Sequence, residues 1–284
     1  MNKIDNFALI IGSMKSGTTS LFEYLSQHPQ IASCAHKEPN FFAFDWHWNE
    51  GFEWYSNLWK DWNQQQHKIA LEASTNYTKS HLYPHTVTRI KSIEDQYQVK
   101  FKFIYLVRDP IERIESHYTY AMTTNLSVEY KKDSKGIDED LIETSKYAKQ
   151  IAEFNRKFSS SQILVLKFDE FKKNPDEIIQ QVCRFLEIDS EYQFQNLNMI
   201  HNPTQSRILD VDWWIRLKRN KLAKNISNFF SETQKVKLRL LVGGRKISSN
   251  FKLSNQQKQS IREILREDLD QLNVKYGIDL SDSV

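Results

Sequence analysis

Short apolar runs punctuate this chain, and amphipathic stretches separate them. The runs occupy residues 7–11, 69–71, 101–107 and 163–166, and residues 101–107 form the clearest one. A continuous apolar run of this length is typical of a strand that is buried on both faces of a parallel sheet. The pattern therefore predicts four buried strands.

Helical spacing of apolar residues follows most of these runs, and strands that alternate with helices form βαβ units. We expect one α/β domain over residues 1–284, with a parallel sheet flanked by helices and a C-terminal helical part. Helices are predicted over residues 18–27, from Asp109-Pro110 through His117, over 176–186 and over 253–272.

Composition narrows the class of protein. The 284 residues carry a net charge of +3, and 39% of them are hydrophobic, which is enough apolar side chain to bury a core. No run approaches the roughly 18 apolar residues of a membrane span, and the first apolar run is too short for a signal peptide. Cys34 and Cys183 are too few for a disulfide framework. We therefore expect a cytoplasmic protein without a transmembrane segment. The sequence does not indicate the number of subunits.

Charge is unevenly distributed along the chain. Residues 213–252 hold eleven Lys/Arg and one acid, Glu232, so the rest of the chain is net acidic. Such a segment, with apolar residues at helical spacing between its charges, is typical of a solvated basic face. A membrane surface, an anionic acceptor or the mouth of a donor site would suit it as well. No nucleic-acid-binding module is visible, so we predict no nucleic-acid partner.

A loop bounded by glycines joins the first predicted strand to its helix, with the sequence Gly12-Ser-Met-Lys15-Ser-Gly17-Thr18-Thr19-Ser20. Such a loop points backbone N–H groups at whatever lies on the helix N-terminus, where the helix dipole adds positive charge. Lys15 adds a full charge, and the hydroxyls that follow Gly17 add donors. The loop therefore predicts an anion site for a phosphate or a sulfate.

This loop departs from the Walker A pattern. Gly12 and Gly17 have the required separation, but Thr18 stands where that pattern has a lysine, and Lys15 comes three residues early. No obvious acidic metal ligand follows at the end of a later strand. We therefore expect a nucleotide site without a metal, and the displaced lysine speaks against the alternative of a magnesium-ATP-dependent small-molecule kinase.

A second constellation follows the clearest strand. Arg108 lies at the edge where ligands bind in open parallel sheets, and Arg113 and Ser116 are expected on one face of the next helix. Arginine suits a phosphate dianion, because its guanidinium donates two hydrogen bonds. The alternative is a structural ion pair of Arg108 with Asp109 or Glu112.

Three motifs occur in order: Lys15-Ser-Gly-Thr-Thr19, Lys37-Glu-Pro-Asn-Phe-Phe42 and Arg108-Asp-Pro-x-x-Arg113-x-x-Ser116. Together they resemble the sulfotransferases that use 3′-phosphoadenosine 5′-phosphosulfate (PAPS), most of all the bacterial and the heparan sulfate enzymes. The match covers residues 7 to about 120, and a weaker one continues toward the C-terminus. The resemblance implies a P-loop-like fold and PAPS as co-substrate.

On this resemblance, the first loop would hold the 5′-phosphosulfate, and Lys15 would contact the oxygen that bridges phosphorus and sulfur. Arg108 and Ser116 would bind the 3′-phosphate, which distinguishes this donor from ATP. Arg207 would lie in a loop that closes over the adenine and the 3′-phosphate. The implied donor contacts are Lys15, Ser16, Gly17, Thr18, Thr19, Ser20, Arg108, Ser116 and Arg207.

The acceptor hydroxyl must lose a proton, which requires a general base within hydrogen-bond reach. Glu38 stands where the heparan-type members carry their catalytic glutamate. His36 and His117 are the alternative bases. Heparan-type enzymes usually carry a lysine at the position of Ala73, and its absence leaves the acceptor class open.

Residues 41–62 hold ten aromatic side chains, which could cap the sheet or stack on a sugar ring. Four of them are expected in the core: Phe41, Phe42, Trp54 and Tyr55. The expected acceptor contacts are Trp46, His47 and Trp48, together with Lys37 beside the base and Glu72, which would orient substrate or the base.

These observations predict a sulfotransferase that moves a sulfuryl group from PAPS to a hydroxyl, or to an amine, of a small metabolite or carbohydrate. A role in specialised metabolism or glycan modification would suit such an enzyme. The alternative outside catalysis is a module that binds a membrane or a polyanion through residues 213–252.

Overall fold

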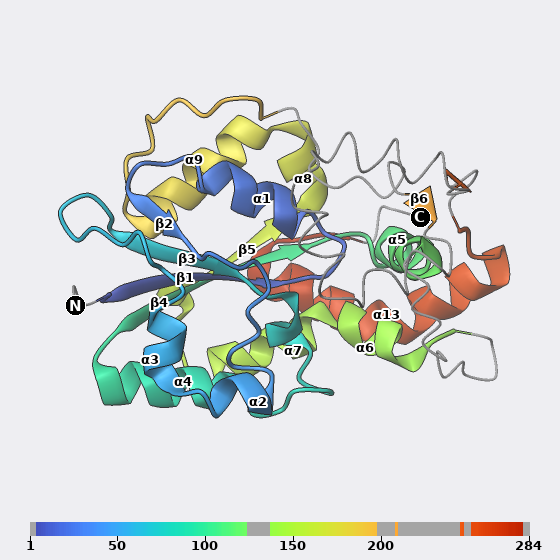
Figure 1. Ribbon diagram of the computed structural model, residues 1–284. Helices are drawn as coiled ribbons and strands as arrows, with labels where there is room; N and C mark the ends of the chain where they lie inside the picture. The colour runs from blue at the N-terminus through green and yellow to red at the C-terminus, as the bar shows by residue number, and fades with distance from the viewer. Residues whose placement is uncertain (1–3, 124–136, 198–207, 210–244, 247–250, 281–284) are drawn as a thin grey trace.

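A parallel sheet forms the centre of the protein, with helices on both of its faces (Figure 1). The structure is a computed structural model that describes residues 4–123, 137–197, 208–209, 245–246 and 251–280. In this part of the chain, five strands follow the order β2-β3-β1-β4-β5. They are β1 (Asn6–Gly12), β2 (Ile31–Ser33), β3 (Ile69–Ala73), β4 (Lys100–Val107) and β5 (Ile163–Lys167). The predicted α/β class is confirmed.

The four predicted strands are all present, and the sheet has one strand that the pattern missed. β1 lies at the centre, because Leu9 pairs with Glu72 of β3 on one side and with Phe103 of β4 on the other. The missed strand, β2, is three residues long and pairs with β3 at the sheet edge. A segment this short provides no continuous apolar run. All five strands are parallel, so the loops after them meet at one edge of the sheet.

Helices cover the sheet in two layers, and a further group lies beyond its carboxyl edge. The helices are α1 (Thr18–Leu25), α2 (Asp45–Trp48), α3 (Gly51–Ser56), α4 (Thr86–Tyr97), α5 (Pro110–Thr123), α6 (Glu139–Ser145), α7 (Tyr147–Asn155), α8 (Phe168–Lys173), α9 (Pro175–Leu186) and α13 (Asn255–Tyr276). The short 3₁₀ helices are η1 (Thr75–Thr78) and η2 (Ser160–Gln162), and the two-residue strands β6 (Ile208–Leu209) and β7 (Arg245–Lys246) pair with each other.

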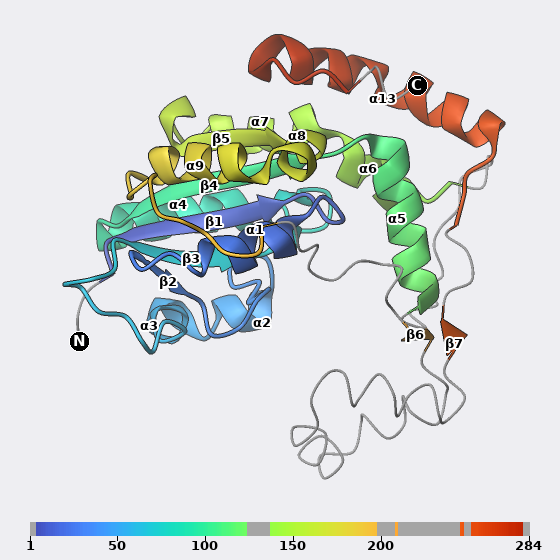
Figure 2. The same cartoon turned by 90° about the horizontal axis from the view of Figure 1, so that it is seen from above.

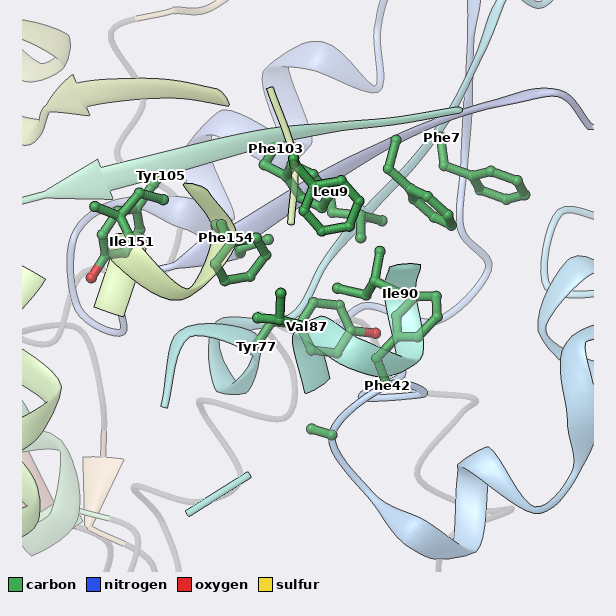
Figure 3. Close-up of a cluster of buried hydrophobic side chains, with 14 of the residues drawn as sticks. Phe7, Leu9, Phe42, Tyr77, Val87, Ile90, Phe103, Tyr105, Ile151 and Phe154 are labelled. Carbon is green, nitrogen blue, oxygen red and sulfur yellow. The ribbon is translucent and has the colours of Figure 1, made fainter. Parts of the chain in front are cut away.

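Alternation along the strands divides the core between the two faces. Phe7, Leu9 and Phe103 belong to the cluster that Val87, Ile90 and Phe154 of α4 and α7 complete (Figure 3). The neighbouring residues of the same strands, among them Ala8 and Ile10, belong to the cluster under α1 and α9. The buried cysteines contribute one packing position to each cluster.

The C-terminal helix α13 runs along α7 and α6, away from the edge strand β2 (Figure 2). It begins at a capping box, in which the Ser254 hydroxyl accepts from the Gln257 N–H and the Gln257 side chain accepts from the Ser254 N–H. It ends at Gly277, whose left-handed φ of 66° suits a helix C-cap. Ile261 and Leu265 of α13 pack with Ile114 of α5 in a third apolar cluster. The predicted C-terminal helix is thus confirmed, four residues longer at its end.

Candidate active site

The first loop is held at the carboxyl end of the sheet by contacts to the neighbouring strand. The Ser13 N–H donates to the carbonyl of Leu106 in β4 at 2.7 Å. The Ser13 and Ser16 hydroxyls lie 2.6 Å apart, and both side chains are buried. Lys15, at the tip, adopts a left-handed φ of 73°. Such backbone geometry is uncommon outside glycine and concentrates at functional sites.

Helix α1 begins directly after the loop and directs its N-terminus at the same space. Its N-cap is Gly17, which has no side chain to cap the first N–H groups, so these groups are available to an anion. Gly17 has a left-handed φ of 84°, and a Cβ there would lie 2.6 Å from the Phe168 ring. The residue is therefore glycine for two reasons, the backbone angle and the close approach of α8. Thr18 and Ser20 are buried in the first turn, and Thr19 is half-buried.

The two predicted anion sites are adjacent in the structure. Arg108, directly after β4, donates from Nη1 to the main-chain oxygen of Lys15 at 3.2 Å. The Lys15 ammonium lies 4.7 Å from the centre of the Tyr120 ring on α5. The carboxyl end of β4 thus brings the arginine to the tip of the first loop.

Arg108 forms an ion pair, as one of the two readings of its motif predicts. Its Nη2 and Nε donate to Glu112 Oε2 at 2.7 and 3.2 Å. Asp109 instead caps α5, where its Oδ1 accepts from the Glu112 N–H at 2.7 Å. The Glu112 side chain is 50% exposed, so the guanidinium faces a partner that stands at the surface. The Arg108 hydrogen bonds hold the pKa of Glu112 below its usual value.

Arg113 and Ser116 lie three positions apart on α5, as the spacing predicts, but the arginine does not face solvent. Arg113 is fully buried, and it donates to the Ser145 hydroxyl and to the Leu141 carbonyl of α6. Among the described residues, its Nη1 has no hydrogen-bond partner. Ser116 is half-buried one turn later on α5. Arg113 therefore contributes charge from beneath the site, and α6, which periodicity alone does not locate, takes up its hydrogen bonds.

Positive charge concentrates around the first loop, and it contributes to the lowered pKa of His117. Burial lowers the pKa of His117 to about 2, and the charges of Arg113, Lys79 and Lys15 act in the same direction. A histidine with this pKa is a poor proton acceptor near neutral pH. The other alternative base, His36, is exposed on the loop after β2. The four cations Lys15, Lys79, Arg108 and Arg113 thus converge on one end of the sheet.

Glu38 reaches the same edge from the loop after β2. Its N–H donates to the Ala73 carbonyl at 2.9 Å, which fixes the loop to the end of β3. The carboxylate accepts from the Thr75 N–H at 3.0 Å and from Lys37 Nζ at 3.0 Å. One third of the Glu38 side chain is exposed, and its φ of 60° is left-handed. An oriented carboxylate that keeps contact with solvent is suited to accept a proton.

Glu72 lies beneath Glu38 and is closed off from solvent. Its carboxylate accepts from the hydroxyls of Tyr55, Tyr77 and Ser74 at 2.9, 2.8 and 3.0 Å. Burial raises the pKa of Glu72 to about 7, although these hydroxyls act in the opposite direction. The Ser74 hydroxyl also accepts from the Asn40 N–H at 3.1 Å, so Glu72 supports the loop that carries Glu38.

Lys79 is the site residue that sequence reasoning missed. It directly follows η1, and its Nζ donates to Asn76 Oδ1 at 2.8 Å and lies 3.8 Å from the Met14 Sδ of the first loop. Burial lowers the pKa of Lys79 to about 8. A lysine shortly after a strand that ends at the ligand-binding edge was the available signal, but its contact with the loop depends on how η1 turns.

The aromatic stretch splits much as expected. Phe41, Phe42 and Tyr55 are fully buried, and Trp54, which is half-buried, packs against them. The remaining candidates lie on α2 at the surface. Trp46 is 63% exposed, His47 Nδ1 lies 2.6 Å from the Pro39 carbonyl with its ring on Trp54, and Trp48 lies against Arg89.

Nearly the whole chain matches a known protein family. The sulfotransferase domain model matches residues 5–273. The chain belongs to the sulfotransferase domain family. The sulfotransferase from Alicyclobacillus acidocaldarius has the same fold, with a TM-score of 0.63, 19% identity and 99% of each chain covered. The predicted P-loop-like fold is thereby confirmed.

Curated relatives of this sulfotransferase-family chain include human heparan sulfate glucosamine 3-O-sulfotransferase 5, 28% identical over 67% of the chain and 56% of the relative. The membrane-associated sulfotransferase kil1 of Dictyostelium discoideum is 34% identical over 42% of the chain and 23% of the relative. The chain therefore spans between about a quarter and little more than half of these relatives' lengths.

Some predicted features of this family member lie outside the described residues. Arg207 and most of the basic segment 213–252 are among them. Within the described ranges, no helix combines the length and apolar character that a membrane span requires. The same ranges contain no group of three or more His, Cys, Asp or Glu side chains placed to bind a metal ion.

Proposed function

We propose that this chain transfers a sulfuryl group from PAPS to an acceptor hydroxyl. The convergence of four cations on a strand–loop–helix turn carries the proposal. Lys79 lies 3.8 Å from the loop at Met14, and Arg108 contacts it at Lys15, while the N-terminus of α1 faces the same space. A donor with a phosphosulfate and a separate phosphate offers anions for both ends of this cluster.

The donor contacts that we propose combine this arrangement with the resemblance of the motifs to sulfotransferases. We assign the phosphosulfate to the backbone and hydroxyls of Ser16, Gly17, Thr18, Thr19 and Ser20, with Lys15 at the bridging oxygen. The 3′-phosphate would bind Arg108 and Ser116, with Arg207 as a further contact. In the structure the Arg108 guanidinium pairs with the half-exposed carboxylate of Glu112, so the 3′-phosphate would replace Glu112 as its partner. This exchange accounts for an arginine that is paired and still accessible.

The reaction is a displacement at sulfur. The acceptor oxygen forms a bond to sulfur, the bond from sulfur to the bridging oxygen breaks, and 3′-phosphoadenosine 5′-phosphate (PAP) leaves with the electron pair. Lys15 stabilises the negative charge that grows on the bridging oxygen. Glu38 accepts the proton from the acceptor hydroxyl, because its carboxylate is held by Thr75 and remains partly exposed.

For the acceptor, we propose a carbohydrate hydroxyl in preference to a small metabolite or an amine. Two relatives are named for glucosamine 3-O-sulfation of heparan sulfate, and the exposed Trp46 offers a ring for stacking on a sugar. Lys37 pairs with Glu38, and His47 contacts the Pro39 carbonyl of the same loop, next to Trp48. Glu72 is fully buried and would act through Ser74. A cytoplasmic location and a metal-free reaction stay predictions.

The test is sulfuryl transfer from [³⁵S]PAPS to three acceptor classes: a glucosamine-containing oligosaccharide, p-nitrophenol and an alkyl amine. We expect labelled product with the oligosaccharide, with equal rates in EDTA and in magnesium. The kinase alternative would replace sulfotransfer if two results were found together. The first is that none of the three acceptors gives labelled product and no sulfate is released from PAPS. The second is that the protein transfers phosphate from ATP in magnesium.

A further inference from the structure

A line of hydrogen bonds connects the first loop to the segment that carries Glu38. Lys79 Nζ lies 3.8 Å from Met14 Sδ in that loop and donates to Asn76 Oδ1 at 2.8 Å. Asn76 Nδ2 donates to Asn40 Oδ1 at 3.1 Å. Asn40 Nδ2 donates to the main-chain oxygen of Glu38 at 2.8 Å. Each amide uses both its oxygen and its nitrogen, so the line has one consistent direction.

These contacts hold a backbone that the residues would not adopt by themselves. Glu38 and Asn40 have left-handed φ values of 60° and 51°. Non-glycine residues persist in that region where their surroundings fix them. The amide of Asn40 is the contact that reaches both the Glu38 carbonyl and the Asn76 side chain. The line therefore ties the backbone that carries Glu38 to Asn76, while Thr75 and Lys37 contact the carboxylate itself.

Lys79 is also electrostatically tied to this site. Burial disfavours its charged form, Glu38 and Asp140 favour it, and Arg113 of α5 disfavours it. Lys79 in turn acts on His117 of α5 and on His81. Protonated Lys79 donates a charge-assisted hydrogen bond to Asn76, which is stronger than the bond from a neutral amine.

We propose that Lys79 is a positioning residue for the base of this reaction. Acting through Asn76 and Asn40, it fixes the Glu38 loop against the first loop, so that the base and the bound donor keep the relative position that proton removal and sulfuryl transfer require. This inference rests on the proposed function, since Glu38 is a base only if transfer takes place. It also places a lysine at this edge in a chain that has Ala73 where heparan-type relatives usually carry one.

The first test separates kcat from KM. Asn76→Ala, which leaves all four cations in place, should lower kcat by roughly 10- to 100-fold, as expected for a misplaced reacting group, while KM for PAPS changes less than about threefold. Lys79→Met should lower kcat by a similar factor and also raise KM for PAPS, because the cation cluster loses a member. The rate is PAP release from PAPS with the oligosaccharide, or with water as acceptor. Lys60→Met, at an exposed lysine on the loop after α3, is the matched control and should leave both constants unchanged.

The double variant tests whether the two residues act as one line. Lys79→Met combined with Asn76→Ala should lose little more kcat than either single variant, because both changes break the same connection. Additive losses would show that Lys79 acts on its own and would overturn the relay. Normal kcat in Lys79→Met would overturn the whole inference.

The pH profile gives a readout that a merely structural role would not move. With the pKa of Lys79 at about 8, kcat/KM of the wild type should fall as pH rises through about 8, since that ratio reports the free enzyme. Lys79→Arg stays protonated at higher pH, so it should retain most of the activity and move the alkaline limb upward. An unchanged limb in Lys79→Arg would contradict the proposal, even if Lys79→Met did not fold. A wild type that neither binds PAP nor releases it from PAPS would instead refute the proposed function.

Discussion

The two halves of this site are built in different ways. The half that we assign to the donor is one continuous segment, in which β1, the first loop and α1 follow each other within twenty residues, and it presents backbone N–H groups to an anion. The acceptor half joins the loop after β2 to the end of β3 and η1, through contacts between residues more than thirty positions apart. This half is held together by side chains, since Asn40 donates to the Glu38 main-chain oxygen and accepts from Asn76.

The difference explains where such a site can change. A donor loop made of backbone and a helix N-terminus tolerates few alternatives, because Gly17 has no room for a Cβ. A network of side chains can change one residue at a time, because each contact, such as that of Asn76 with Asn40, involves one pair of side chains. The acceptor half is therefore the part of the fold in which a new acceptor specificity can arise while the donor stays the same.

The largest expected effect comes from the acceptor half. Glu38→Gln keeps the size of the side chain and removes the proton acceptor, so transfer should fall by roughly 10²- to 10⁴-fold. PAP binding, measured by titration calorimetry, should change less than about threefold. The same substitution at the exposed Glu53 on α3 is the control. If Glu38→Gln also abolished PAP binding, the two halves would not be separable.

Lys15→Ala breaks the donor half at its tip. Loss of the charge at the bridging oxygen should lower kcat by roughly 10²- to 10³-fold, and it should also weaken PAP binding because the cation cluster loses a member. Steady-state kinetics and calorimetry check the two parts. Near-normal turnover would remove Lys15 from the mechanism.

Glu72→Gln tests the support beneath the acceptor half through its pH dependence. The folded protein holds the pKa of Glu72 at about 7, above the ordinary value of 4.5, so the folded state binds the proton more tightly than the unfolded state. Stability from this group is present below about pH 4.5 and is lost as pH rises through about 7, on the order of 3 kcal/mol in total. Denaturant unfolding between pH 4 and 8 should show this decline in the wild type and a flatter profile in Glu72→Gln.

Gly17→Ala gives the smallest expected effect and has a matched control in Gly51→Ala. Both glycines have a similar left-handed φ, 84° and 82°, but a Cβ at Gly51 meets nothing within 4 Å. Each alanine should cost about 1 kcal/mol of unfolding free energy for the backbone. Gly17→Ala should cost a further 1–2 kcal/mol, roughly, for the contact with Phe168. Equal losses in the two variants would mean that α8 moves aside freely.

How much the sequence foretells follows the same division. Continuous apolar runs predict β1, β3, β4 and β5, and the spacing of glycines, lysine and hydroxyls predicts the loop that the structure places at the carboxyl end of the sheet. The burial of Arg113 depends on α6, which no apolar period marks. The contact of Lys79 with the first loop depends on the direction in which η1 turns. The left-handed φ angles of Glu38 and Asn40 depend on partners that are distant in sequence. Local patterns carry no information on such pairings.

We propose that the cation cluster binds the two phosphates of PAP, the spent donor. Thermal denaturation with PAP, ADP and magnesium-ATP, for the wild type and Arg108→Ala, tests it directly. We expect selective stabilisation by PAP, about 2.7 kcal/mol at 100 times its dissociation constant, and loss of that selectivity in Arg108→Ala. Stabilisation by magnesium-ATP alone, or an equal response to PAP and ADP, would contradict it.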